Sequence, residues 1–237
     1  MKEKEFDDLI EAMSKCRSCM SLRKKSGRDC SLINIYCDVD FGKSIPSVWT
    51  DWYRRLDSSI MVIGQDWGPY ADMEKLHNSY LTNPTLENWD YLINSEKSLT
   101  KKMLMKYLLE SAKNSHTSID IDNIFITNAI MCARKGNLYR GENIDLLKST
   151  IYCSDYLKRQ IDIIKPKVII TLGYYPLFSL ATMYGFHISH RLSDIIRDMP
   201  VIKQDDFVII PCYHPTAQVK KDVQFEQYMR IWDFLVP

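Results

Sequence analysis

Residues 60–68 read IMVIGQDWG, so that four apolar residues run directly into a glycine, an amide, a carboxylate and a tryptophan. A short, continuous apolar run is typical of a strand that is buried on both faces of a parallel sheet. In such sheets ligands bind beyond the carboxyl ends of the strands. The stretch therefore predicts a buried strand that ends at a functional edge.

Three other segments share this apolar pattern, and helical periodicity separates them. The predicted strands are 59–64, 124–130, 167–173 and 207–211, and the predicted helices are 100–111, 143–164 and 176–184. Alternating strands and helices indicate a sheet that is covered on both faces. We therefore predict an α/β fold, a three-layer α/β/α sandwich around a central, mainly parallel four-stranded sheet.

Two segments lack this order. Residues at about 27–57 have no clear periodicity and are expected to form an irregular arm, and residues at about 69–99 form a long polar loop with a short helix near 85–93. Long loops at strand ends are often functional. Because no repeat, low-complexity tract or linker divides the chain, we expect a single domain over residues 1–237.

The composition is that of an ordinary globular protein. The 237 residues are 46% hydrophobic and 26% charged, and the net charge of +1 gives no global attraction to polyanions. No apolar run approaches the roughly 20 residues of a membrane helix, and the charged start of the chain has no signal-peptide core. We therefore expect a cytoplasmic protein without membrane contact, in which clustered cysteines bind metal or react rather than form disulfides.

The cysteines suggest a metal site. Cys16 and Cys19 form a C-x2-C pair, which can chelate one centre, whereas Cys132 closes the segment ITNAIMC and Cys153 lies on the next predicted helix. Folding could bring the two lone cysteines back to the pair. Spacing also admits Cys30 and Cys37 as ligands, and two buried core cysteines beside an idle pair are the structural alternative. Cys212, within VIIPC, is expected to be a small buried hydrophobic residue.

Groups suited to acid–base chemistry and hydrogen bonding stand at three strand ends. Gln65 and Asp66 follow the first strand, Asn128 lies near the end of the second and His214 follows the last. A carboxylate beside an apolar sheet can act as an acid or base, and a buried unpaired amide costs about 1–3 kcal/mol unless a ligand meets it. A turn aspartate, an amide bonded to a loop and a surface histidine are the structural alternatives.

Basic residues flank these candidate sites. Six of them lie at positions 15–28, a stretch that contains no acidic residue, and further pairs follow Cys132 and His214. They are Lys15, Arg17, Arg23, Lys24, Lys25 and Arg28, then Arg134–Lys135 and Lys220–Lys221. Such runs are usually solvated surface, but their position here fits a groove that follows phosphates.

Together these residues resemble the uracil-DNA glycosylase superfamily, in particular its iron–sulfur branch. That branch has a C-x2-C, a strand ending in G-E-x-P-G, a strand like T-N-x-x-K-C-R followed by N-R, a further cysteine and a terminal H-P-S. This chain offers, in the same order, Cys16 and Cys19, GQDWG at 64–68, TNAIMCAR at 127–134, Gly136–Asn137, Cys153 and HPT at 214–216. The resemblance covers most of the chain and implies the same three-layer fold.

The stretch at 64–68 departs from that branch. It is more similar to the G-Q-D-P-Y-H motif of the cluster-free uracil-DNA glycosylases, whose aspartate orients the attacking water and whose tyrosine excludes thymine. Trp67 and Gly68 replace that Pro-Tyr, and Tyr70 comes two positions later than the tyrosine. The segment that supplies the base-stacking aromatic is missing, which leaves Tyr80, Trp67 and Trp89 as candidates.

The resemblance implies an enzyme, a DNA glycosylase that hydrolyses the N-glycosidic bond of uracil or a related deaminated base in DNA for base excision repair. The roles that it implies are catalytic for Asp66 and His214, substrate-binding for Gly64, Gln65, Asn128 and Tyr80, and metal-binding for Cys16, Cys19, Cys132 and Cys153. The implied cofactor is an iron–sulfur cluster [4Fe-4S], with zinc as the lesser possibility. The implied partner is DNA containing the deaminated base, and we expect a monomer.

Two alternatives come from other classes. A nucleic-acid-binding protein could retain the glycosylase fold and the metal site without catalysis, because a fold does not guarantee an activity. The altered GQDWG segment favours that alternative. A zinc-stabilised α/β hydrolase of a small nucleotide is the other.

Overall fold

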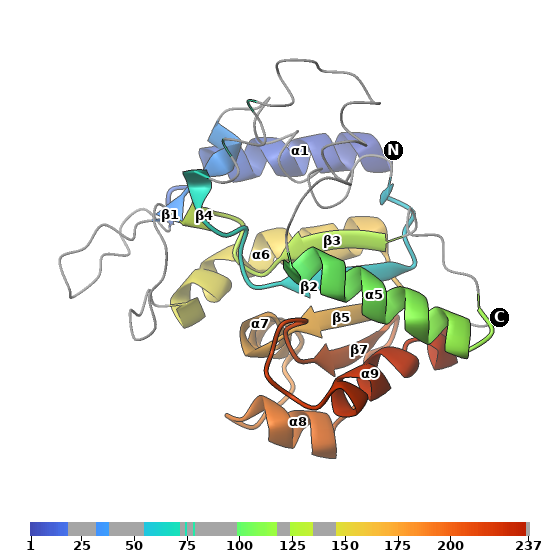
Figure 1. Cartoon of the computed structure of the whole chain (residues 1–237). Helices are drawn as coiled ribbons and strands as arrows, with labels where there is room; N and C mark the ends of the chain where they lie inside the picture. Colours follow the sequence, from blue (N-terminus) through green and yellow to red (C-terminus); the bar gives the residue numbers. More distant parts are fainter. Residues whose placement is uncertain are drawn as a thin grey trace, which may run out of the picture.

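The structure of the protein is a computed structural model, and it describes residues 1–18, 32–37, 55–71, 74, 78, 99–117, 124–134 and 146–235. A five-stranded sheet lies at its centre, with helices on both faces (Figure 1). The strand order is β3-β2-β5-β7-β6. The strands are β2 Ile60–Gly64, β3 Ile124–Asn128, β5 Val168–Leu172, β6 Ile202–Lys203 and β7 Val208–Cys212.

Four of these strands, β2, β3, β5 and β7, run parallel. They are the four that the sequence predicts, and the predicted α/β/α sandwich with a mainly parallel sheet is confirmed. β6 adds a fifth, antiparallel strand beside β7. It is only two residues long, which is too short to leave an apolar run in the sequence.

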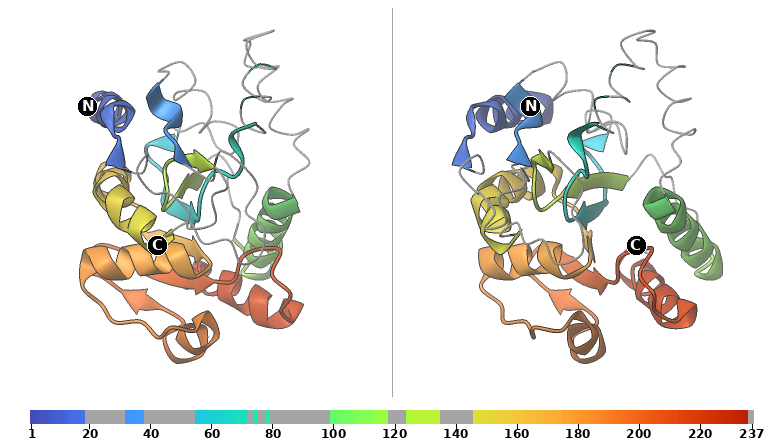
Figure 2. Two further views of the ribbon diagram at one scale, coloured as in Figure 1. Left: turned by 90° about the vertical axis from the view of Figure 1, so that its left-hand side faces the viewer. Right: turned by 60° about the vertical axis from the view of Figure 1, so that its left-hand side comes forward.

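Helices cover both faces of the sheet (Figure 2). α1 Lys2–Lys15, α6 Leu146–Ile164 and α7 Tyr174–Tyr184 pack on one face, and α5 Leu99–Asn114 and α9 Lys221–Met229 pack on the other. Two short elements complete this part of the chain, α8 Leu192–Asp198 beside β7 and the 3₁₀ helix η6 Trp232–Phe234.

Alternate residues of each strand point to opposite helical layers, because side chains in a strand have a period of two. The α1, α6 and α7 side of β2 is buried through Met61 and Ile63, and the α5 and α9 side through Ile60 and Val62. Both layers exclude water from the strands. This double burial explains why each strand is a continuous apolar run in the sequence.

The predicted helices 100–111, 143–164 and 176–184 correspond to α5, α6 and α7. α7 ends at Tyr184, and the φ of 72° at the next residue, Gly185, suits glycine. α1 was not predicted, yet its buried residues Phe6, Leu9, Ile10 and Met13 have the spacing of one helical face. None of the helices in the described ranges is long and apolar enough to cross a membrane.

Part of the predicted arm at 27–57 belongs to the core. β1 Leu32–Ile33 pairs antiparallel with β4 Ala133–Arg134, and the 3₁₀ helix η2 Ile35–Cys37 follows it. Leu32, Ile35 and Tyr36 are buried in the layer of α1 and α6. Most of the loop at 69–99 and the helix predicted near 85–93 lie outside the described residues.

Candidate active site

The first part of the site is the shared end of β2 and β3. Gly64 and Asn128 are the last residues of these strands and pair in register. Asn128 fills the space beside Gly64 so closely that a Cβ on Gly64 would collide with its Oδ1. The chains continue side by side beyond the strands, because the N–H of Ala129 donates to the Gly64 carbonyl at 2.8 Å. A glycine at 64 therefore makes room for the amide at this edge.

The Asn128 side chain suits ligand recognition. The residue is only 7% exposed, and its amide makes no hydrogen bond within the part of the chain that the structure describes. A buried amide without partners is costly, whereas a ligand that offers both a donor and an acceptor would satisfy it. Asn128 is thus poised to read a polar, planar group.

Asp66 is held in one orientation by three hydrogen bonds. Its Oδ1 accepts from the Gly68 N–H at 2.7 Å and from Arg134 Nε at 3.0 Å, and its Oδ2 accepts from Gln65 Nε2 at 2.8 Å. Only 4% of the Asp66 side chain is exposed. Charge-assisted hydrogen bonds are the strong ones, so this arrangement fixes the carboxylate in place.

His214 stands two residues beyond β7 and completes the sheet edge. Its Nδ1 lies 2.9 Å from Thr216 Oγ1, and the Thr216 N–H points to the same nitrogen at 3.4 Å. Gln224 of α9 donates to the His214 carbonyl at 2.9 Å and so fixes the backbone. An amide donor facing Nδ1 favours the tautomer that carries its proton on Nε2.

Asp66 and His214 interact electrostatically. Partial desolvation lowers the pKa of His214, and the negative charge of Asp66 acts in the opposite direction. The net lowering favours a neutral imidazole at pH 7. Because the His214 side chain still reaches solvent, a ligand at this edge can meet its Nε2.

Three of the four predicted metal ligands lie in one neighbourhood. The pKa of Tyr156 is raised to about 12, first by burial and then by the hydrogen bond with Cys16 and by the charges of Cys16, Cys153 and Asp155. Burial also raises the pKa of Tyr36, hydrogen bonding from Trp67 opposes it, and Cys132 and Cys153 add to the rise.

These thiols have the chemistry of metal ligands. Burial acts to raise the pKa of Cys16, but the Ser18 backbone, Tyr156, the Ser18 hydroxyl and Arg17 together lower it. The Met131 N–H points to Cys153 Sγ at 3.5 Å, the kind of contact that stabilises a thiolate. Within the described ranges, no group of three or more His, Cys, Asp or Glu residues is arranged to hold a metal ion. The fourth predicted ligand, Cys19, lies outside those ranges.

Other residues that the sequence predicted for the site also lie outside the described ranges. Tyr80 and Trp89, two candidates for stacking on a base, lie outside the described residues, as do Cys30 and the side chain of Cys37. Trp67, the third stacking candidate, is 9% exposed and belongs to the core cluster that contains Cys132 and Cys153. Its indole therefore packs into the core and leaves little surface for a ligand to stack on.

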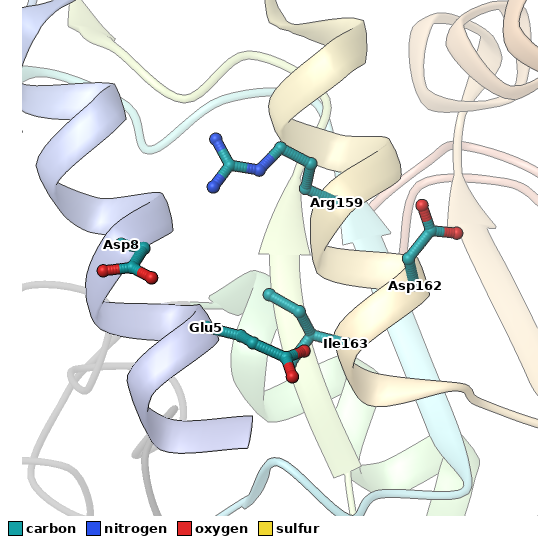
Figure 3. A pocket seen from close by; sticks show the side chains of 5 residues that line it. All are labelled: Glu5, Asp8, Arg159, Asp162 and Ile163. Carbon is teal, nitrogen blue, oxygen red and sulfur yellow. The ribbon is translucent and has the colours of Figure 1, made fainter. Parts of the chain in front are cut away.

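A separate hollow lies between α1 and α6 (Figure 3). It has a volume of about 230 Å³ and is lined by Glu5, Asp8, Arg159, Asp162 and Ile163. Three carboxylates and one guanidinium give it a negative balance, which does not suit a phosphate-bearing ligand. None of these residues belongs to the sheet edge, so the hollow is distinct from the candidate site.

Sequence reasoning missed two contributors. Arg134 belonged to a basic run, but nothing in its position along the chain pointed to Asp66, from which it is separated by 68 residues. Tyr36 lies in the supposed arm, yet it is buried next to Cys132 and Cys153. An aromatic residue in an apolar segment was the only signal for it.

Comparisons of the sequence with known proteins point to one family. The sequence model of the family described as the uracil DNA glycosylase superfamily matches residues 51–235. The chain is 33% identical over 102 residues to a type-4 uracil-DNA glycosylase of Sulfurisphaera tokodaii and 29% identical over 116 residues to one of Saccharolobus solfataricus. These alignments cover 42% and 46% of this chain and 43% and 49% of the relatives, so the matches span less than half of either.

Proposed function

Because the chain belongs to the uracil DNA glycosylase superfamily, we propose that it hydrolyses the N-glycosidic bond of uracil, or of a related deaminated base, in DNA. The observation that supports this most directly is the sheet edge itself. There a buried carboxylate is fixed within electrostatic reach of a histidine. Beside the strand that leads to that carboxylate lies the Asn128 amide, which has no hydrogen-bond partner among the described residues. The products would be free base and an abasic site for base excision repair.

A glycosylase must take its target base out of the DNA stack before it can reach the glycosidic bond. Extrusion costs a few kcal/mol, and hydrogen bonds to the pairing edge of the base offset that cost. Asn128 would supply them, since its amide has both a donor and an acceptor and no competing partner among the described residues.

As the bond breaks, negative charge builds on the leaving base and positive charge on the sugar. Neutral His214 would donate from Nε2 to a base oxygen, in the manner of an oxyanion hole. Asp66 would orient the attacking water through Oδ2, where a lone pair remains, and its charge would stabilise the sugar cation. Gln65 would keep Oδ2 in place for that task.

We also propose that Cys16, Cys19, Cys132 and Cys153 hold a [4Fe-4S] cluster, with zinc as the lesser alternative. The grouping of three of these thiols around Tyr36 and Tyr156 supports the proposal. When bound, the cluster would crosslink the N-terminal segment, the segment after β3 and α6, without any redox step. DNA is the proposed partner, and we expect the protein to act as a cytoplasmic monomer.

The experiment is a base-release assay on protein purified without oxygen. A duplex and a single strand, each with one uracil, are incubated with the protein and then treated with alkali, which cleaves at abasic sites. The proposal predicts cleavage at the uracil only. Intact DNA with uracil, hypoxanthine and xanthine substrates would instead favour the binding protein without catalysis, an alternative that the family and the named relatives do not favour.

A further inference from the structure

Arg134 contacts the loop of Asp66 through both its backbone and its side chain. The Arg134 N–H donates to the Gly68 carbonyl at 2.9 Å, and a β-bridge joins Arg134 to Pro69. The side chain reaches Asp66 Oδ1 through Nε at 3.0 Å. A residue that follows Cys132 by two positions thus clamps the segment that carries the carboxylate.

The guanidinium uses only part of its hydrogen-bonding capacity in this contact. Arginine has five N–H donors, and Nε supplies one of them. Across the residues that the structure describes, Asp66 is the sole side-chain partner of Arg134, and both Nη groups are left over. The side chain is 18% exposed, and Nη2 lies 4.0 Å from the position that a Cβ on Gly68 would take.

The charges of Asp66 and of the DNA phosphates indicate a role for the unused Nη donors of Arg134. A buried carboxylate that must approach DNA repels the phosphates on either side of the target nucleotide. A guanidinium between them neutralises the carboxylate and offers a planar pair of donors that fits a phosphate. The same side chain can therefore face Asp66 through Nε and a phosphate through Nη.

Resting on the proposed function, we propose that Arg134 is a positioning residue that fixes Asp66 Oδ1 through Nε and binds one backbone phosphate of the DNA through its Nη groups. Engagement of the phosphate holds the guanidinium in place and leaves Asp66 Oδ2 directed at the attacking water. The residue does not touch the reacting atoms. It couples DNA binding to the orientation of the carboxylate.

The test compares Arg134→Gln, Arg134→Lys and Arg134→Ala with a matched control, Arg197→Gln. Arg197 is an exposed arginine of α8 that pairs with Asp194 and Asp198, away from the sheet edge. Each variant is measured for thermal midpoint, for single-turnover release of uracil and for the salt dependence of DNA binding. Lysine keeps the positive charge but lacks the planar set of donors of the guanidinium, so it separates the phosphate contact from the fixing of Asp66. It also remains informative if the neutral variants fold poorly.

We expect Arg134→Gln to slow single-turnover release by about tenfold to a hundredfold, the cost of misplacing a catalytic group. It should also reduce the slope of log K against log salt by about one, because one phosphate contact is lost. Arg134→Lys should restore the slope and only part of the rate, and Arg197→Gln should change neither. In an Asp66→Asn background, Arg134→Gln should cost little further rate, since the two groups act as a unit.

An unchanged salt slope in Arg134→Gln would overturn the phosphate contact, and an unchanged rate, or an equal loss in the Asp66→Asn background, would overturn the positioning role. The failure of the proposed function is distinguishable from both. If the wild-type protein releases no base, the function fails, whereas the salt slope of DNA binding still tests the phosphate contact of Arg134. The Arg134 variants could also lose thermal stability while the salt slope of DNA binding and the release rate of the folded fraction stay unchanged. Arg134 would then have only a structural role.

Discussion

The side chain of Asn128 occupies the space that a side chain at position 64 would need, so Gly64 and Asn128 form one unit at the end of β2 and β3. Gly64 has no positive φ within the described backbone, which means that its lack of a Cβ, and not its backbone freedom, matters here. The amide can only lie at this edge because its neighbour is a glycine.

This relationship predicts the result of Gly64→Ala. The new methyl should push Asn128 away from the edge and slow uracil release by about tenfold or more, on the scale of a lost hydrogen bond to a charged leaving group. The control is the same change in an Asn128→Ala background. Once the amide is gone, the methyl has room and should cost almost nothing further, so an equal loss in both backgrounds would contradict the account.

The electrostatic pairing of Asp66 with His214 predicts a shift that NMR can measure. Burial lowers the pKa of His214 below its ordinary value of 6.5, and the charge of Asp66 raises it. Asp66→Asn removes the group that favours the imidazolium, so the pKa should fall further. Titration of the imidazole resonances measures this, and Asp162→Asn on α6 is the control that should leave the pKa unchanged.

The lowered pKa of His214 also determines how base release depends on pH. A lowered pKa keeps His214 neutral down to a pH below 6.5, and the neutral ring can accept from the Thr216 N–H while Nε2 donates. The rate of single-turnover release should therefore stay level from pH 8 to pH 7, because both values lie above the ordinary histidine pKa of about 6.5. The rate should decline only below pH 6.5. If the rate already declined above pH 6.5, the imidazolium would form at a higher pH than a lowered pKa of His214 allows, and this prediction would be contradicted.

The grouped thiols predict which cysteines hold metal. Cys16→Ser, Cys132→Ser and Cys153→Ser should each lower the iron content and the visible absorption of the purified protein, because serine is a poor ligand for an iron–sulfur cluster. Cys212→Ser is the matched control, since Cys212 is buried in β7, where burial raises the pKa of its thiol. Retained iron in all three variants would mean that other residues bind it.

The burial of Trp67 predicts a role in stability. Trp67→Ala should lower the free energy of unfolding by about 3–5 kcal/mol, the usual cost of removing a large aromatic side chain from a core. Tyr70→Ala, at a half-buried position in the same segment, should cost less. Denaturant unfolding measures both, and an unfolding free energy that Trp67→Ala leaves unchanged would contradict the core position of the indole.

The parallel strands could be predicted because each is buried on both faces, which leaves an unbroken apolar run such as IMVI before Gly64. Gln65, Asp66 and His214 were predicted at the correct edge for the same reason, since parallel strands end together. α1 was overlooked because Asp7, Asp8 and Glu11 interrupt its four buried side chains. Its apolar spacing was present in the sequence but gave no continuous run.

The ion pair between Arg134 and Asp66 could not be predicted from the sequence. It depends on the pairing of β4 with β1 and on the bridge to Pro69, which together set where the Arg134 side chain points. Likewise, the core position of Trp67 could not be predicted from its motif, which made Trp67 a candidate for stacking on a base. The ion pair and the position of Trp67 both depend on how distant segments pair, and local sequence patterns carry no information on that pairing.

The most direct test of the central claim is the rate at which purified protein releases uracil from a uracil-containing oligonucleotide, compared with Asp66→Asn under the same conditions. The account predicts release by the wild-type protein and a loss of about a hundredfold or more in the variant, the scale of positioned acid–base and charge effects. Equal rates for the two proteins, or no release by either, would contradict it.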